Sequence, residues 1–336
     1  MEVFKRSADK IPFNFEGSGF EYFKIWIVNI LLTIVTFGIY SAWAKVRRKQ
    51  YIYGNTSLDG VYFEYLAKPT KILKGRILAV LFLMAYQVGV RFFPPLGMAF
   101  ILLLAFLFPW VINKGLKFNA VNSSYKNIRF NFNATYSKTF VNITLVSLLI
   151  PLTFGLAYPY VIYRMKKHVV EHSCFGTTPF KFNGDANGFY RIYVMVFAFF
   201  LAPLVAAAIA KDVFANPSTG AVVPFLILAL YFLIFVYIRT YQTNYILSNT
   251  AINTHRFNSS LFLPPMIFIY ATNIIATALS FGLFIPWAKT RLLKYRLENL
   301  EVIPGIGLEE FLNIKQEEMS AFGDEISDLF DIDIGL

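Results

Sequence analysis

The sequence predicts an all-α polytopic membrane protein with about seven apolar segments arranged in internal repeats. Hydrophobic residues make up 57% of the 336-residue chain, charged residues only 15%, and the mean hydropathy is +0.53. Soluble domains carry about 25% charged residues. Most of the apolar residues lie in runs long enough to span a bilayer. Three of these runs end in the same Phe-Gly phrase, which indicates that one structural unit has been copied.

The apolar segments and the expected division of the chain follow from these runs. The segments cover residues 23–43, 76–90, 96–113, 139–163, 190–210, 221–240 and 261–287. Short polar turns join the second segment to the third and the fifth to the sixth, so we expect two helical hairpins there. The predicted units are a first membrane repeat (1–120), a second (121–245), a truncated third (246–300) and an acidic amphipathic tail (301–336).

The Phe-Gly phrase leaves two topologies open. If each copy crosses the bilayer once, successive repeats are inverted, as in many transporters. If each copy enters and leaves on one face, only Arg91 and Lys211 of the 31 lysines and arginines lie on the other face. The positive-inside rule favours this re-entrant arrangement, whereas the length of each run favours a crossing. We favour the re-entrant arrangement.

The polar connections contain alternating aromatic residues that predict short β-hairpins at the cytoplasmic face. Alternation with a period of two after an Asn or Gly turn is typical of a strand. Because a lone hairpin is marginally stable in water, we expect these hairpins to pair into a small sheet on the bilayer face. The alternating stretches are Phe13-Asn14-Phe15, Phe63-Glu64-Tyr65, Phe130-Asn131-Phe132 and Phe180-Lys181-Phe182.

Three stretches of the first repeat closely resemble the YjgN-like family of bacterial inner-membrane proteins. They read FEGSGFEYFKIW (15–26), TFGIYSAWAKVRR (36–48) and YGNTSLDG (53–60). The resemblance extends to about Leu300, and the second repeat departs from the pattern, for example with Ile162 in place of Lys. It implies a multi-pass protein of the bacterial inner membrane. It implies no activity and no catalytic residues.

The residues with the clearest functional signal are three arginines, each nine residues after the Gly of its phrase: Arg47, Arg164 and Arg291. A guanidinium group suits a phosphate or a carboxylate, so the three could converge on one anion. The simpler alternative is that each arginine anchors a helix end among lipid headgroups. Trp43 and Trp287, at matching positions in two phrases, are candidate headgroup contacts in an interfacial aromatic belt.

Asn29 and Asn273 lie nine residues before their Gly, inside apolar runs. An amide in a membrane needs a hydrogen-bond partner, so packing between helices is the first interpretation. The other interpretation is a polar lining for the path of a solute.

The sequence contains no signal for catalysis, a cofactor or a metal. His168 and His172 would share a helix face, but the other two repeats lack ligands there, so we expect no metal site. A Walker loop, a nucleophile elbow and a zinc-protease motif are all absent, so we expect no enzyme. The apolar segments also lack the acidic residues that proton- or sodium-driven carriers need.

The expected function is therefore a passive or partner-coupled pathway for a small solute or lipid. The alternative is a membrane scaffold that binds anionic lipid or a cytosolic partner through its basic face, because 30 of the 31 basic residues precede Glu301. The expected partners are the lipid bilayer with its anionic headgroups and, through the acidic tail, a second copy of the chain or a cytosolic protein. Nucleic acid is not expected, because the basic residues are spread between apolar segments.

Overall fold

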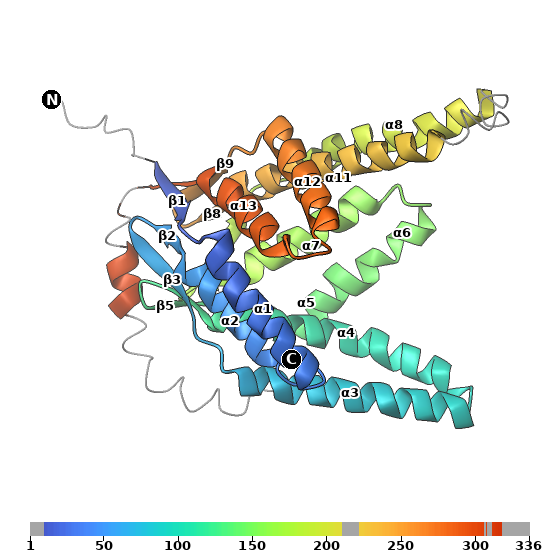
Figure 1. Ribbon diagram of the computed structural model, residues 1–336, viewed down its shortest axis with the longest axis horizontal. Helices are drawn as coiled ribbons and strands as arrows, with labels where there is room; N and C mark the ends of the chain where they lie inside the picture. The colour runs from blue at the N-terminus through green and yellow to red at the C-terminus, as the bar shows by residue number, and fades with distance from the viewer. Residues whose placement is uncertain (1–9, 210–221, 306, 308–310, 318–336) are drawn as a thin grey trace.

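Ten antiparallel strands close into a barrel, and the helical hairpins protrude from one of its ends (Figure 1). The computed structural model describes residues 10–209, 222–305, 307 and 311–317. The barrel closes between the first strand and the last, where Ile11 is opposite Val302. The strands are β1 (Ile11–Phe15), β2 (Thr56–Leu58), β3 (Val61–Tyr65), β4 (Ser123–Tyr125), β5 (Ile128–Phe132), β6 (Ser173–Phe175), β7 (Thr178–Phe182), β8 (Thr250–Ile252), β9 (His255–Ser259) and β10 (Leu300–Ile303).

Helical hairpins connect neighbouring strands, so each hairpin returns to the barrel beside the strand from which it left. Two hairpins are long: α3 (Pro69–Phe92) with α4 (Leu96–Val121), and α8 (Ala186–Ile209) with α11 (Val223–Ser248). The three shorter hairpins contain the Phe-Gly phrases. They are α1 (Gly19–Val35) with α2 (Ser41–Gly54); α5 (Tyr136–Thr139), the π-helix η1 (Phe140–Leu145) and α6 (Leu149–Leu152) with α7 (Tyr158–His172); and α12 (Leu263–Leu279) with α13 (Ile285–Glu298).

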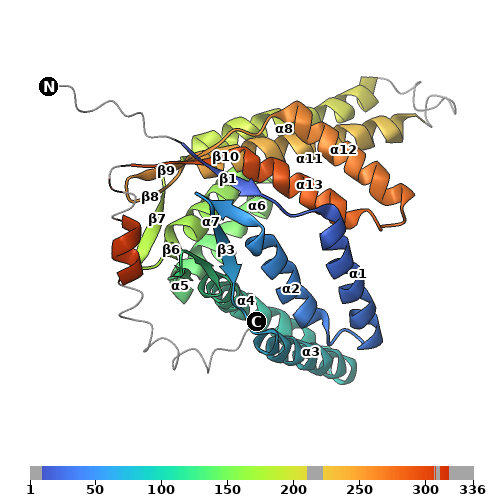
Figure 2. The same cartoon turned by 60° about the vertical axis from the view of Figure 1, so that its left-hand side comes forward.

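The strand register places every junction between a strand and a helix at the same end of the barrel. Phe15 at the end of β1 pairs with Thr56 at the start of β2, and the same arrangement recurs where Tyr65 pairs with Ser123. The remaining junctions follow the same rule. All the helical hairpins therefore project to one side, as Figure 2 also shows.

The prediction of an all-α protein is wrong. The alternating aromatic stretches do lie in strands, but these strands form a closed antiparallel barrel and not a small sheet on the bilayer face. Each strand gains a partner on both sides because every helical hairpin returns next to its starting strand. Closure leaves no unpaired edge, which is the most complete way to satisfy the backbone hydrogen bonds of a sheet.

The prediction of about seven apolar membrane segments is also wrong. Three helices in the described part of the chain are long and apolar enough to cross a membrane, namely α3, α4 and α11. Only 6% of the most apolar 18-residue stretch of α4 is made up of residues buried within the protein. A helix surface that faces lipid is expected to be exposed in this way. The segment 190–210 falls mainly in α8, and residues 210–221 lie outside the described part.

Each Phe-Gly phrase forms a turn between two helices. The apolar runs that looked continuous in the sequence are therefore each divided into two shorter helices. Phe37, Phe154 and Phe281 have φ angles of 48–50°, and the glycine after each has a φ of 88–90°. In the first turn the amide of Gly38 donates a hydrogen bond to the carbonyl of Thr33 at 2.7 Å, as in a Schellman motif. Helix α1, with 17 residues, is about 25 Å long, so it is shorter than the hydrocarbon core.

Gly38→Ala is expected to destabilise the protein by about 1–2 kcal/mol, because a residue with a side chain is strained at positive φ. Gly38 has a φ of +90°, and an added methyl group would meet no atom within 4 Å, so strain alone is tested. Gly54→Ala is the matched control, since its methyl group also enters open space but its φ is not positive. Denaturant titrations of both variants in the same detergent measure the difference. Equal stability of the two variants would contradict the assigned turn.

Candidate functional site

Each of the three arginines selected from the sequence donates a hydrogen bond within its own hairpin. The guanidinium of Arg47 donates to Tyr40 Oη at 2.9 Å, that of Arg164 to Asn142 Oδ1 at 2.6 Å and that of Arg291 to Thr272 Oγ1 at 2.8 Å.

The two tryptophans occupy different surroundings. Trp43 stacks on Tyr40 with ring centroids 6.1 Å apart, and it packs against the core that holds α2 on α3 and α4. Trp287 lies 5.0 Å from the ring of Phe23, at the contact between α1 and α13. This contact joins the first helical hairpin to the last. Gly19 is required there, because any side chain on it would collide with the Trp287 ring.

Asn29 and Asn273 are both buried, with 7% of each residue exposed. The amide nitrogen of Asn273 donates to the carbonyl of Ala288 at 3.1 Å, which links α12 to α13. Within the part of the chain that the structure describes, the side-chain oxygens of both residues have no partner. Asn29 lines a pocket near the start of α2, and Asn273 is not among the residues that line this pocket.

That pocket lies between α1, α2, α3 and α13 and has a volume of about 320 Å³. Four basic side chains from three helices line it: Lys45 and Arg48 from α2, Arg76 from α3 and Lys289 from α13. We call it the basic pocket. The other lining residues are Tyr22, Trp26, Asn29, Ile30, Thr33, Ile34, Ser41 and Ala44.

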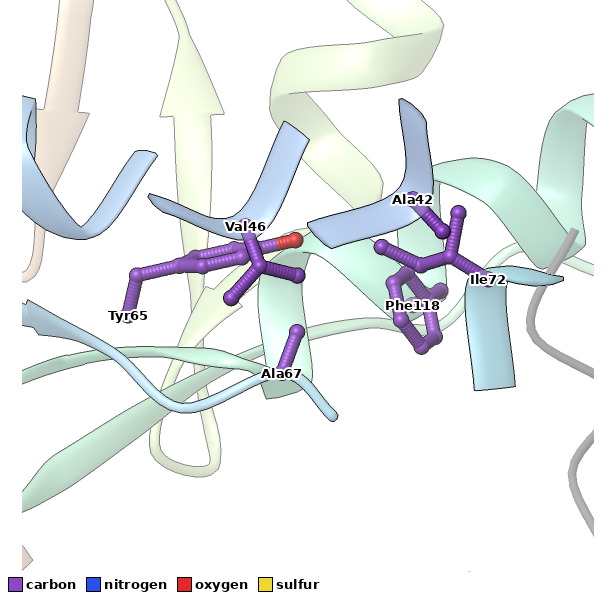
Figure 3. Packing of buried hydrophobic residues seen from close by; sticks show 6 residues of the cluster. All are labelled: Ala42, Val46, Tyr65, Ala67, Ile72 and Phe118. Atoms are coloured by element: carbon purple, nitrogen blue, oxygen red, sulfur yellow. The ribbon is translucent and has the colours of Figure 1, made fainter. Parts of the chain in front are cut away.

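The core beneath α2 fixes the position of Lys45 and Arg48. Ala42 is buried against Ile72 and Phe118 of the α3–α4 hairpin, and Val46, one turn further along the same face, is buried beside Tyr65 and Ala67 (Figure 3). Burial of this face leaves the basic side chains of α2 turned towards α1. The guanidinium of Arg76 in turn donates to the hydroxyl of Ser41 at the start of α2.

The basic pocket has a strongly positive and uncompensated charge. No acidic residue lines it, and in the described ranges none of its four cations forms a salt bridge. Burial is the main cause that lowers the pKa of Lys45, and the charges of Arg76 and Arg48 lower it further. Burial and the charge of Arg48 also lower the pKa of Lys289. An anion in the pocket would relieve this mutual repulsion.

Two buried polar groups in the same pocket lack partners in the described part of the chain. They are the hydroxyl of Tyr22, a residue that is only 1% exposed, and the side-chain oxygen of Asn29. A buried polar group without a hydrogen bond costs about 1–3 kcal/mol, so native proteins usually satisfy it. Phosphate oxygens would accept a hydrogen bond from the Tyr22 hydroxyl. They would also accept one from Asn29 if its side-chain amide is flipped, so that the NH₂ group takes the place of the oxygen. The pocket therefore has the donors of an anion site.

Sequence reasoning selected Asn29 but missed the four cations. A signal was present, because Lys45 and Lys289 both stand seven residues after the Gly of their phrase. In the second repeat Ile162 occupies the corresponding position. Arg76 gave no such signal, because it comes from a helix without the phrase.

Among the described residues, the histidine cluster does not belong to a group of three or more side chains placed to hold a metal ion. His168 is 3% exposed, and its Nε2 lies 2.9 Å from the hydroxyl of Thr139. Burial, together with the charges of His172 and Lys138, lowers the pKa of His168 to about 4. His168 is therefore a neutral core residue at physiological pH.

Comparison with known proteins gives a family but no activity. The sequence model of the family described as "Bacterial protein of unknown function (DUF898)" matches residues 10–329. The chain is 24% identical to inner membrane protein YjgN of Salmonella typhimurium, over 86% of this chain and 87% of that protein. It is 37% identical to inner membrane protein YjgN of Escherichia coli K12, over 37% of this chain and 31% of that protein. No solved structure matches the chain.

Proposed function

Since the chain belongs to the DUF898 family of bacterial proteins of unknown function, we propose that this membrane protein binds the phosphate of an anionic phospholipid headgroup in its basic pocket. The observation that carries the proposal is the pocket's donor set. Four cations and two unsatisfied buried polar groups face one space of about 320 Å³ that no acidic residue lines. Guanidinium and ammonium groups are the usual protein ligands of a phosphate.

The surroundings of the pocket favour a lipid over a soluble phosphate. Helix α1 forms one wall, and it exposes Ile34 of the pocket lining by 68% and the neighbouring Leu31 and Val35 outside the lining by 55% and 73%. Such a continuous apolar surface is unusual on a protein in water and suits contact with acyl chains. A phospholipid could place its headgroup among the cations and its chains along α1.

The distribution of charge supports a cytoplasmic barrel. Every helical hairpin returns to the barrel, so the lysines and arginines of the described ranges, apart from Arg91, belong to the barrel side in this topology. The positive-inside rule assigns such a side to the cytoplasm, where anionic lipid is available. We therefore propose a headgroup site at the cytoplasmic leaflet of the inner membrane.

Binding of a lipid agrees with one of the two functions expected from the sequence, whereas a pathway through the protein is not proposed. A pathway through Asn29 and Asn273 would need both residues to line one space, and Asn273 lies outside the basic pocket. Binding alone is proposed, without a catalytic step. An interaction of the acidic tail with a partner stays a prediction from the sequence.

Native mass spectrometry of the purified protein with added lipid tests the proposal. The wild-type protein is expected to retain phosphatidylglycerol in preference to phosphatidylcholine, and Arg48→Gln is expected to lower that retention about tenfold, as for a lost charge-assisted hydrogen bond. Arg47→Gln is the matched control, because Arg47 directly precedes Arg48 on α2, does not line the pocket and donates a hydrogen bond to Tyr40.

A second arm separates the two sources of phosphate. Inorganic phosphate and glycerol phosphate are titrated against bound phosphatidylglycerol. Displacement only at concentrations far above those of the lipid supports a lipid site, whereas equal affinity for free phosphate would indicate a soluble ligand. Equal retention of both lipids by wild type and Arg48→Gln would contradict the proposal.

A further inference from the structure

The interior of the barrel contains a second pocket that is separate from the basic pocket and apolar. Its volume is about 250 Å³. A closed barrel of eight strands is just wide enough for its own side chains to fill. Ten strands enclose more space, so the side chains of this barrel meet around a cavity and do not fill it.

A ring of five cross-strand pairs lines the cavity. Each long strand β1, β3, β5, β7 and β9 contributes one inward phenylalanine, and its partner on the neighbouring strand is also inward and mostly apolar. This ring explains the alternating aromatic stretches of the sequence. The pairs are Phe13 with Leu58, Phe63 with Tyr125, Phe130 with Phe175, Phe180 with Ile252, and Phe257 with Val302.

His255 on β9 contributes a polar group, its imidazole ring, to the lining of this apolar cavity. The residue is 1% exposed and lines the cavity. Its Nδ1 accepts a hydrogen bond from the backbone amide of Gly305 at 2.8 Å, so the proton of the neutral imidazole lies on Nε2. In the described ranges that buried Nε2–H group has no acceptor.

The other polar groups of the lining are already satisfied or lie at its rim. The hydroxyl of Tyr125 donates to the carbonyl of Leu58 at 2.8 Å. The side chain of Asp59 is 60% exposed and lies 3.7 Å from Lys126. No lysine or arginine lines the cavity, and His255 is neutral there, so the cavity suits a neutral molecule better than a carboxylate. Water is a poor occupant, since it needs two to four polar partners.

The described part of the C-terminal tail covers the end of the barrel away from the helical hairpins (Figures 1 and 2). Phe311 is 9% exposed and lies 5.3 Å from the His255 ring and 6.3 Å from the Phe175 ring. The ammonium group of Lys315 donates to the hydroxyl of Thr177 at 2.8 Å, which fixes this cover to the β6–β7 turn. A ligand in the cavity would therefore be shielded from water.

We propose that the barrel binds a small neutral apolar molecule that carries one carbonyl oxygen, of the class of medium-chain ketones and esters, with the carbonyl accepting the Nε2–H hydrogen bond of His255. The five-pair ring supplies the apolar contact, and His255 supplies the orientation. Medium chain length follows from the limited volume of the cavity.

Nuclear magnetic resonance of the protein labelled with ¹⁵N-histidine tests this site, because the chain has only three histidines. The full-length protein in lipid nanodiscs is titrated with 2-decanone, and decane is the control for simple filling of the cavity. The ketone is expected to shift the Nε2 signal of His255 saturably and to leave the signals of His168 and His172 unchanged. Decane is expected to compete with the ketone without producing the hydrogen-bond shift.

Two variants separate binding in the cavity from partition into lipid. Val302→Phe fills the cavity and is expected to abolish the shift, whereas Ile303→Phe, on the next residue of β10 and outside the cavity lining, is expected to preserve it. His255→Phe is expected to weaken 2-decanone binding about tenfold, followed by the ketone's ¹³C carbonyl signal, and to leave decane binding unchanged. The signals of His168 and His172 report that each variant is folded.

The proposal is overturned if 2-decanone leaves the His255 signal unchanged up to saturation of the bilayer. It is also overturned if the shift persists in Val302→Phe, since the ketone would then act from outside the cavity. Neither outcome affects the basic pocket, which a different set of residues lines.

Discussion

Phe281→Lys is expected to destabilise the protein in a bilayer by about 2.5–3.5 kcal/mol, the cost of a lysine in the middle of a membrane. Phe281 is 97% exposed at the tip of the α12–α13 hairpin. The tips of the other two short hairpins carry Phe37 and Phe154, both 98% exposed. Three fully exposed phenylalanines are difficult to explain in water but suit insertion into hydrocarbon. Denaturant titration in lipid bicelles measures the change.

Phe262→Lys is the matched control for Phe281→Lys. Phe262 immediately precedes α12 at its barrel end and is 64% exposed. About 25 Å of helix separates it from the tip, so its lysine can reach the headgroups at little cost. Similar destabilisation by both lysines would show that the tip lies in an aqueous environment and would contradict the insertion of the short hairpins.

The double variant Arg48→Gln with Arg76→Gln is expected to lower the affinity for phosphatidylglycerol at least 100-fold. Each charge-assisted hydrogen bond contributes about 1.5–3 kcal/mol, and every 1.4 kcal/mol changes the affinity tenfold. The folded structure is expected to remain, because the substitutions also relieve repulsion with Lys45 and Lys289. Lipid titration into protein in nanodiscs of phosphatidylcholine measures the affinity.

The matched control for the double variant pairs Arg47→Gln with Arg291→Gln, which remove the same charge from residues outside the basic pocket. If this control weakens binding as much as the double variant does, net charge and not the pocket determines lipid affinity. That result would replace a defined site by a diffuse basic surface.

Local patterns in the sequence predicted the local structure that depends on neighbouring residues. The alternation in Phe130-Asn131-Phe132 lies in β5. The glycine of each Phe-Gly phrase has the positive φ that glycine tolerates best. In these places the conformation is determined within a few residues.

The closure of the barrel and the basic pocket depend on residues that are far apart in the sequence. The pair Ile11 and Val302 closes the barrel, and no local pattern specifies that pairing. The basic pocket likewise joins Arg48 of the first hairpin to Lys289 of the last. Hydropathy was misleading for a different reason, because an apolar run looks the same whether it forms one long helix or two short ones around a turn.

The most direct test of the central claim, that the whole barrel lies on one side of the membrane, is labelling of single cysteines with a membrane-impermeant maleimide. The background is Cys174→Ser, which removes the only native cysteine. Exposed positions on four different strands are compared with Arg91, at the far end of α3. The substitutions are Glu64→Cys, Arg129→Cys, Lys181→Cys, Arg256→Cys and Arg91→Cys.

The four strand positions are expected to react only from the cytoplasmic side, in inverted vesicles, and Arg91→Cys only from the opposite side, in intact spheroplasts. This result follows from the return of every helical hairpin to the barrel. Reaction of any strand position from the same side as Arg91→Cys would contradict the fold and, with it, the location of the basic pocket.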